Sequence, residues 1–488
     1  MTSPVGITSF GAYVPRLRLA RENIAKAHAW ALPNLKGLAR GERSMCNWDE
    51  DSITMAVEAA RDCLTGRDGS AVDGLYFAST TLPFLDRQNA GVIGAAINLE
   101  AGLSSLDIAG SQRAGTSALI TALKATGEGE SLVVASDARK AKPASTDEMH
   151  FGHGAAAFGV GSDNVIAKCL GSHTVTVDFV DHYRGEGEDF DYGWEERWVR
   201  EEGYLKIVPQ AVKGLMDKVG GSGDDIAHFV MPCTMRGIPG RVAKMFGIAD
   251  DAVVDNMAGT VGDTGAAHAL LMLVSALETA KAGDKILVVN FGQGADVLLL
   301  EATEALANLP KRAGAAGSIA RGRTETDYMK FASFQNNVKL DFGMRAETDN
   351  KTALSMEFRK KDMVTGFTGG KCSKCGTVQY PRSRYCVNPN CQAFDTQEPE
   401  PFADKPATLM SFTADWLSYN PSPPFFYGQV NFDGGGRALM GFTDTDAGQL
   451  QVGTSLKMMF RIKDYDDVRG YRRYFWKAAP DLNAEKEA

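Results

Sequence analysis

Apolar side chains recur at two different spacings along the first 310 residues, and these spacings predict alternating helices and strands. Residues 49–66 place apolar side chains such as Ile53 and Val57 on one helical face. Either Asp49 or Asp51 is expected to cap that helix. Short apolar runs typical of buried strands occur at 74–80, 131–137, 174–180 and 228–232, and residues 284–301 predict a hairpin of two strands joined by a glycine turn. The alternation predicts an α/β fold.

Two stretches repeat the same order of elements and point to an internal duplication. LDIAGSQRAGTSALITALKATGEGESLVVAS and DNMAGTVGDTGAAHALLMLVSALETAKAGDKILVVN both run from a small-residue corner through a long helix to an apolar strand. Self-similarity at a spacing of about 150 residues predicts a duplicated α/β unit. We assign the two halves to residues 1–170 and 171–312.

The last third of the chain has a different pattern. Residues 313–324 are small and basic, which predicts a flexible linker. Residues 325–400 contain a helical stretch and a cysteine-rich segment. Residues 401–480 hold several short strands of alternating hydrophobicity separated by turn residues, which predict a small β-barrel.

Four cysteines, Cys372, Cys375, Cys386 and Cys391, stand in the pattern C-x2-C-x10-C-x4-C. Each cysteine pair can form a turn that directs both thiolates to one metal ion, and four thiolates favour tetrahedral zinc. Iron in a rubredoxin-like site is the second choice. Because four thiolates leave no open coordination position, we expect a structural zinc and look for the chemistry elsewhere.

Composition and charge indicate where the protein is expected to be located and which classes of partner it is not expected to bind. The formal net charge of −9 argues against non-specific binding to nucleic acid or to an anionic membrane. We find no apolar run of about 18 residues and no basic-then-apolar secretory signal. Eight cysteines in 488 residues do not form a disulfide framework. We therefore expect a cytoplasmic protein without nucleic-acid or membrane partners.

The stretch SLDIAGSQRAGTSALITAL at 105–123 predicts a buried strand, a sharp corner and a helix that opens at Ala114. A helix N-terminus favours negative charge, so such a corner is where an enzyme places a nucleophile. The residue at its tip is Gln112, a carboxamide.

Two further pairs of polar residues are candidates for proton transfer. Asp263 stands at a second corner and His268 about one turn into the following helix, where they could act as base and orienter. The structural alternative is that Asp263 caps its helix and His268 packs in the core. The aromatic, acidic segment 178–198 contains His182 and Tyr183, and either could act as a base or lie in a solvated loop that contacts a neighbouring subunit.

The motifs SQRAGTSAL, SDARKAKPAS, FGHGAAAFGVG, VGDTGAAHAL and VVNFGQGADVLLLE resemble the thiolase superfamily, within it the hydroxymethylglutaryl-CoA synthases and type III ketoacyl synthases. Residues 325–480 resemble the zinc-ribbon and OB-fold proteins that accompany thiolases and bind acyl-CoA. The resemblance implies a duplicated, five-layered thiolase-like fold followed by a rubredoxin-like zinc ribbon and an OB-fold barrel. It also implies coenzyme A or acyl-CoA as substrate and a homodimer.

The same resemblance shows where this chain departs from its family. The family's acyl-accepting cysteine is expected at Gln112, and its histidine near Cys233. Asp263 matches the family's asparagine, and S79-T-T-L-P-F84 lacks the synthase glutamate. The resemblance therefore implies that this chain has the family's fold, but not that it uses the family's cysteine mechanism.

The resemblance also implies roles for other residues. The amide of Gln112 could donate a hydrogen bond to a thioester carbonyl or an enolate. The insertion at 178–198 is expected to approach the site and to bring a possible base to it. Residues assigned to the oxyanion or substrate region are Thr116, Gly292, Gly294 and Arg113, the last as a contact to CoA phosphates.

We expect an enzyme that acts on an acyl-CoA or β-keto acid and makes or cleaves a carbon–carbon bond, by Claisen or aldol chemistry, or transfers an acyl group to CoA. Two alternatives remain open. The chain could be a non-catalytic acyl-CoA-binding scaffold that pairs with a thiolase-type partner, or a conventional synthase that uses Cys233 as a relocated nucleophile.

Overall fold

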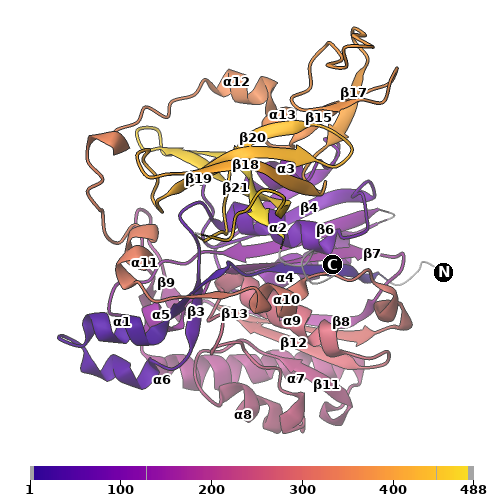
Figure 1. Cartoon of the computed structure of the whole chain (residues 1–488). Helices are drawn as coiled ribbons and strands as arrows, with labels where there is room; N and C mark the ends of the chain where they lie inside the picture. The colour runs from indigo at the N-terminus through magenta and orange to yellow at the C-terminus, as the bar shows by residue number, and fades with distance from the viewer. Residues whose placement is uncertain (1–4, 128, 447, 482–488) are drawn as a thin grey trace. The chain divides into compact units, whose positions relative to one another are not determined.

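The structure is a computed structural model that describes residues 5–127, 129–446 and 448–481. The chain forms two compact units. The first comprises the residues up to 47 together with 51–91 and 100–338, and the second comprises 48–50, 92–99 and the residues from 339 onward. Each unit is described by itself below (Figure 1).

A nine-stranded mixed sheet forms the centre of the first unit, in the order β11-β12-β13-β8-β1-β7-β6-β4-β5. Its strands are β1 (Gly6–Tyr13), β4 (Val72–Ala78), β5 (Ser104–Ile108), β6 (Glu130–Asp137), β7 (Gly154–Gly161), β8 (Ala167–Thr176), β11 (Ile226–Val230), β12 (Lys285–Phe291) and β13 (Gly294–Ala302). The two halves of the sheet meet where β1 pairs with β8 through Gly6 and Ile7. Parallel pairs lie at both outer ends, β4 with β5 and β11 with β12, as a duplicated unit predicts.

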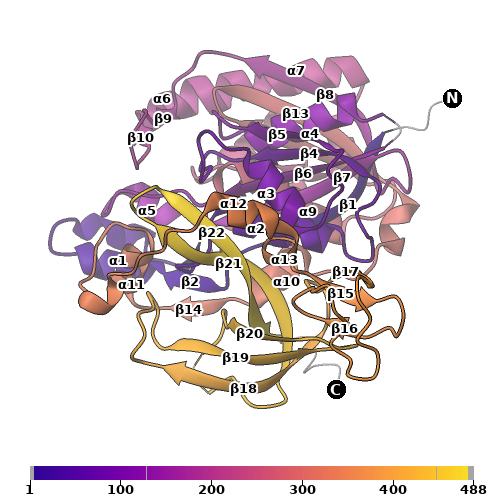
Figure 2. The ribbon, with the colours of Figure 1, turned by 90° about the horizontal axis from the view of Figure 1, so that it is seen from above.

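Helices on and between the two half-sheets complete five layers. The helices α4 (Ala114–Ala125) and α9 (His268–Thr279) contact each other and strands of both halves. The helix α2 (Ser52–Cys63) covers β1, β6 and β7, and α7 (Val208–Val219) lies along β8 and β13 (Figure 2). The central helices are rich in small and apolar residues because they are enclosed on almost every side. The predicted α/β fold with a duplicated unit is therefore present.

Shorter elements complete the first unit. They are β2 (Leu17–Ala20), α1 (Arg21–His28), β3 (Glu42–Met45), α5 (Thr146–His150), β9 (His182–Tyr183), β10 (Tyr192–Gly193), α6 (Glu196–Trp198), the π-helix η2 (Val199–Ile207), α8 (Ile238–Met245), the 3-10 turn η5 (Gly265–Ala267) and α11 (Tyr328–Phe334). The helix α3 (Asn89–Ala96) spans residues of both units. Within the described residues, no helix combines the length and apolar character that crossing a membrane requires.

The segment 313–324, predicted as a flexible linker, is folded instead. It forms helix α10 (Gly314–Ala320) and strand β14 (Arg323–Glu325), which pairs with β2. The carboxylate of Asp62 accepts hydrogen bonds from the N–H groups of Ala313 and Gly314 at 2.9 Å. Small residues that resemble a linker in the sequence therefore serve here to pack a helix closely against β1 and α9.

The second unit holds two sheets. The three-stranded sheet contains β15 (Thr368–Cys372), β16 (Val378–Gln379) and β17 (Gln397–Pro401), and the helices α12 (Leu354–Arg359) and α13 (Lys361–Val364) precede it. The five-stranded antiparallel sheet contains β18 (Ala407–Asp415), β19 (Phe425–Phe432), β20 (Arg437–Gly441), β21 (Ser455–Asp466) and β22 (Tyr471–Pro480). A bridge between Phe442 and Ala478 joins its two edges and supports the predicted barrel, and the OB fold stays a prediction.

Asp51, one of the two expected caps, caps α2: its carboxylate accepts from the N–H of Thr54 at 2.9 Å. Asp49 belongs to the second unit instead. There the ammonium of Lys477 donates to its carboxylate at 2.8 Å and lies 4.1 Å from the ring centre of Trp48. Lys477 and Asp49 thus form a buried ion pair of the second unit.

Candidate active site

The corner that carries Gln112 is held by its neighbours along β12 and β13. The hydroxyl of Ser111 donates to the carbonyl oxygen of Gly292 at 2.7 Å, and the side-chain amide of Asn290 donates to the carbonyl oxygen of Gln112 at 3.3 Å. A side chain at Gly292 would place its Cβ only 2.9 Å from the Ser111 hydroxyl. Glycine is therefore needed for this close approach, and the corner holds the side chain of Gln112 at the start of α4.

The side chain of Gln112 contacts a histidine that is distant in the sequence. Its amide nitrogen lies 3.2 Å from Nε2 of His182, and Nδ1 of His182 lies 2.9 Å from Oδ2 of Asp181. An amide nitrogen can only donate, so Nε2 accepts and the ring proton resides on Nδ1. Asp181 then fixes the tautomer, which leaves Nε2 as the basic nitrogen that faces Gln112.

Two acceptor atoms in this group lack partners. Among the described residues, neither Oε1 of Gln112 nor Oδ1 of Asp181 has a hydrogen-bond partner although both atoms are buried. An unsatisfied buried acceptor costs about 1–3 kcal/mol. Such atoms are ready to accept hydrogen bonds from a bound molecule.

Asp263 reaches the same place from the second corner. The N–H of Gly265 donates to Oδ1 of Asp263 at 2.9 Å, and a Cβ on Gly265 would lie 3.0 Å from Oε1 of Gln112. Burial alone would raise the pKa of Asp263, but the guanidinium of Arg139, 3.2 Å away, holds that pKa below its ordinary value. Asp263 is therefore ionised at neutral pH.

The sequence analysis missed two buried residues that organise these segments. Arg139 contacts both Asp263 and Asp191 and lies 3.6 Å from the ring centre of Phe151. Asp137 accepts hydrogen bonds from the backbone N–H groups of Thr80 and Ala266 at 2.7 and 2.8 Å. A signal was present: Asp137 ends the apolar strand β6 and Arg139 follows it, at the end where such strands position functional side chains.

The structure does not bring His268 into this group. Its Nε2 donates to the carbonyl oxygen of Asn256 at 3.0 Å, and its Nδ1 accepts from the N–H of Thr264 at 3.3 Å. Burial lowers its pKa, so the ring is neutral. With both nitrogens engaged, His268 fits the structural alternative, in which it packs in the core.

Cys233 lies in the apolar core between α7 and the end of β11. Burial raises the pKa of its thiol to about 12, and Tyr204 of the π-helix η2 is hydrogen-bonded to it. Only 6% of the residue is exposed. These surroundings favour a neutral thiol that packs as a small apolar side chain rather than a nucleophile.

The residues assigned to substrate binding mainly hold the corner together. The guanidinium of Arg113 pairs with Asp296 at 2.9 Å, and the buried hydroxyl of Thr116 lies 3.0 Å from the same carboxylate. The N–H of Gly292 already donates to the carbonyl oxygen of Gly294. Arg113 and Gly292 are thus engaged within the protein, which argues against the phosphate contact and the backbone oxyanion donor that the sequence suggested.

Tyr183 lies next to His182 on β9 but does not point into the group. It is 53% exposed, and its ring packs against that of Tyr192 across the β9–β10 hairpin at 5.5 Å. Of the two candidates on this segment, His182 is therefore the one that reaches Gln112.

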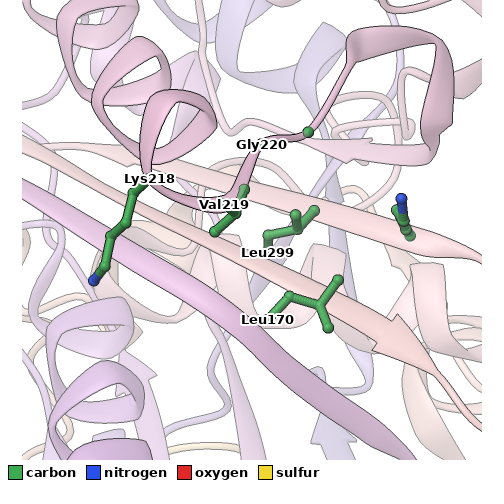
Figure 3. Close-up of a pocket in the computed structure, with 7 residues that line it drawn as sticks. Leu170, Lys218, Val219, Gly220 and Leu299 are labelled. Atoms are coloured by element: carbon green, nitrogen blue, oxygen red, sulfur yellow. The ribbon is translucent and has the colours of Figure 1, made fainter.

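Two surface cavities lie in the first unit. One of about 390 Å³ adjoins the corner and is lined by residues that include Ser111, Arg113, Gly292 and Gln293. The other, of about 320 Å³, lies at the end of α7, where Leu170, Val219 and Leu299 form an apolar floor beside Lys218 (Figure 3). Neither cavity is lined by Gln112 or His182, but the first adjoins their corner through Ser111, so we place the candidate site there.

Comparison with known proteins identifies the family. Residues 216–298 match the family model described as 3-oxoacyl-[acyl-carrier-protein (ACP)] synthase III C terminal. The hydroxymethylglutaryl-CoA synthase of Caldivirga maquilingensis is 30% identical over 348 residues, which cover 70% of this chain and 99% of that protein. This chain belongs to the hydroxymethylglutaryl-CoA synthase family. The synthase of Aeropyrum pernix is 32% identical over 346 residues, covering 69% of this chain and 95% of that protein.

Solved structures of synthases share the fold. An HMG-CoA synthase complexed with CoA aligns with a TM-score of 0.60 at 18% identity and covers 72% of this chain and 95% of that chain. The HMG synthase of the curacin biosynthetic pathway, in complex with acetyl donor-ACP, aligns with a TM-score of 0.62 at 16% identity and covers 82% and 100%. Membership in the synthase family supports an acyl-CoA condensing or acyl-transfer enzyme.

The cysteine cluster is a separate candidate metal site in the second unit of this chain. Residues 366–397 match the model described as ChsH2, rubredoxin-like zinc ribbon domain. The four sulfur atoms lie within 4.8 Å of one another, with Cys375 and Cys386 3.5 Å apart and Cys372 and Cys391 3.9 Å apart. Tetrahedral zinc with bonds of about 2.3 Å requires sulfur separations near 3.8 Å. The four cysteines fit a structural zinc.

Proposed function

We propose that this protein is an acyl-CoA enzyme that makes or cleaves a carbon–carbon bond by aldol-type chemistry, without an acyl group bound to cysteine. The observation that carries the proposal is the hydrogen-bonded series Gln112–His182–Asp181 at the corner where the family resemblance expects the nucleophile. A structural neighbour that binds CoA supports acyl-CoA as the substrate. Acyl transfer between CoA and a β-keto acid remains the alternative reaction.

In the cleavage direction, the first step removes the proton from the β-hydroxyl group of a β-hydroxyacyl-CoA. Nε2 of His182 accepts the hydroxyl proton while Asp181 stabilises the resulting imidazolium. The oxygen lone pair forms a carbonyl at Cβ, the Cα–Cβ bond breaks, and its electron pair moves onto the thioester as an enolate. The imidazolium then returns the proton to Cα. The products are a shorter acyl-CoA and a ketone or aldehyde, and no further reactant is needed.

Gln112 supports the same step by binding the enolate oxygen. The substrate hydroxyl takes the place of the amide at Nε2 of His182, and the freed amide N–H donates to the oxyanion instead, because a protonated Nε2 no longer accepts. A donor of this kind contributes about 3–4 kcal/mol to the transition state.

Aldol chemistry fits the available side chains better than a Claisen reaction through an acyl-enzyme. An acyl-enzyme needs an activated nucleophile. Gln112 cannot supply one, and the thiol of Cys233 is buried with a pKa near 12. Proton transfer and oxyanion binding are the two functions that an aldol cleavage requires, and His182 and Gln112 provide them.

The experiment is turnover by the purified full chain. It is incubated with a panel of β-hydroxyacyl and β-ketoacyl compounds, with and without CoA, and products and the intact chain are followed by mass spectrometry. We expect cleavage or condensation products and no protein adduct. Gln112→Ala and His182→Asn are expected to lower the rate about 10²- to 10³-fold. His228→Asn is the matched control, because His228 pairs with Asp284 outside the site.

The outcomes separate the rival functions. An acyl adduct on Cys233 would replace this proposal by a conventional cysteine mechanism. Tight acyl-CoA binding without any product would favour the scaffold that pairs with a thiolase-type partner. The homodimer and the cytoplasmic location stay predictions, and sedimentation of the purified chain tests the first of them.

A further inference from the structure

The hairpin that carries His182 cannot hold its own position. Its strands β9 and β10 pair only through Tyr183 with Tyr192 and His182 with Gly193. A two-residue ladder is far below the size of an independently stable sheet. The ring of His182 nevertheless lies within hydrogen-bond distance of Gln112, so other contacts must fix the hairpin.

The strongest of these contacts converge on Asp191, at the foot of β10. Nη2 of Arg139 donates to its Oδ2 at 2.9 Å, and Nη1 of Arg184 donates to its Oδ1 at 2.9 Å. Only 5% of the Asp191 side chain is exposed. One carboxylate thus accepts hydrogen bonds from two arginines, and charge-assisted bonds of this kind are shorter and stronger than neutral ones.

Both arginines connect Asp191 to fixed parts of the first unit. Arg139 follows β6, is buried, and also binds Asp263. Arg184 belongs to the hairpin and donates to the carbonyl oxygen of Thr80, in the loop after β4. Asp191 is the group that these two attachments share, and the side-chain amide of Gln293 adds another by donating to the carbonyl oxygen of His182 at 3.2 Å.

We propose that Asp191 is a positioning residue that holds the imidazole of His182 against Gln112. Removal of its charge releases the hairpin from Arg139, and His182 then leaves the amide. The catalytic consequence rests on the proposed function. If that function holds, Asp191→Asn lowers kcat about 10- to 100-fold with little change in KM, because a small displacement of a catalytic group is costly while substrate contacts remain.

The placement of His182 can be tested without turnover, so failure of the reaction and failure of this proposal are distinguishable. The full chain is labelled with ¹⁵N-histidine, and the resonance of His182 is assigned by its loss in His182→Asn, since the chain has seven histidines. In the wild type we expect a protonated Nδ1 and an unprotonated Nε2. In Asp191→Asn we expect the Nε2 resonance to shift because that nitrogen loses the Gln112 amide, as it also should in Gln112→Ala, while Nδ1 keeps its proton beside Asp181. Asp191→Glu should restore part of the shift.

Asp189→Asn is the matched control. It removes the same charge from the same hairpin, but Asp189 is 67% exposed and pairs only with Lys140 at 3.2 Å among the described contacts. It should leave the His182 resonances unchanged. If Asp191→Asn fails to fold, Arg184→Met, which removes the partly exposed arginine, provides the second variant. Wild-type His182 resonances in a folded Asp191→Asn or, failing that, in Arg184→Met would overturn the proposal.

Discussion

The amide nitrogen of Gln112 lies 3.2 Å from Nε2 of His182, so a carboxamide occupies the place beside an imidazole where a nucleophile would be activated. In the family resemblance, that place belongs to a cysteine. The imidazole is oriented by Asp181, as the base of a nucleophilic site would be. The corner thus places a side chain that is not a nucleophile beside an imidazole and at a helix N-terminus.

Gln112→Cys is therefore expected to gain a covalent reaction. The new thiol would lie near His182 and at the N-terminus of α4, and both lower a thiol pKa. Intact-mass spectrometry after incubation with an acyl-CoA should show one acyl group on the variant and none on the wild type. The double variant with His182→Asn should acylate more slowly. A folded Gln112→Cys chain that never acylates would show that acyl-CoA does not reach this corner.

Cys233 should be inert to alkylation in the native protein. Its thiol is buried and has a pKa of about 12, so thiolate is scarce at pH 8. Peptide mapping after brief treatment with iodoacetamide should find Cys233 unmodified, and Cys233→Ser should retain the turnover of the wild type. Rapid alkylation that substrate prevents would contradict this prediction.

His153 should make the first unit sensitive to acid. Burial lowers the pKa of His153 to about 3, while its Nδ1 accepts from the N–H of Cys46 at 2.9 Å. Since the unfolded chain takes up a proton near pH 6.5 and the folded chain does not, the stabilisation is complete above pH 6.5 and is lost as pH falls toward 3. Between pH 8 and pH 5 the free energy of unfolding should fall by about 2 kcal/mol from this residue.

Urea unfolding of the wild type and of His153→Gln at pH 8 and pH 5 measures that contribution. The variant is expected to be less stable at pH 8 but to lose less stability on acidification. Equal losses in the two proteins would mean that His153 does not carry the acid sensitivity.

Lys477→Met should destabilise the second unit by about 3 kcal/mol, because among the described side chains buried Asp49 then keeps only the Thr443 hydroxyl at 3.0 Å and the Arg461 guanidinium at 3.9 Å. Unfolding followed by tryptophan fluorescence is a suitable measurement, since Trp48 and Trp476 belong to this unit. Adding Asp49→Asn to the variant should recover part of the loss. Lys463→Met, at an exposed position of β21, is the control and should change stability little.

Metal analysis should find one zinc ion per chain. Cys372→Ser is expected to abolish zinc binding and to open residues 368–401 to proteolysis, because the metal holds the ends of short strands that have little core of their own. Cys169→Ser, outside the cluster, should keep the zinc. Iron instead of zinc, or full zinc occupancy in Cys372→Ser, would contradict the assignment.

Short-range patterns made much of the fold predictable. The corner before Ala114, the hairpin of β12 and β13 and the cysteine spacing each depend on neighbours in the chain, and the structure has all three. The linker prediction failed at 313–324 because small residues suit a flexible segment and a closely packed helix equally well. The choice between Asp49 and Asp51 as helix cap also needed the structure, because both precede the same apolar pattern.

The sequence by itself determined three features: a corner with Gln112 where a nucleophile is expected, a duplicated α/β unit, and four cysteines spaced to bind a metal. Only the tertiary structure decided which base faces the amide. His182 and Gln112 are 70 positions apart, and Arg139 lies 52 positions from Asp191, so no local spacing relates them. The loops after β5, β6 and β8 meet in the folded unit although four strands separate β5 from β8 in the sheet, and only long-range packing brings them together.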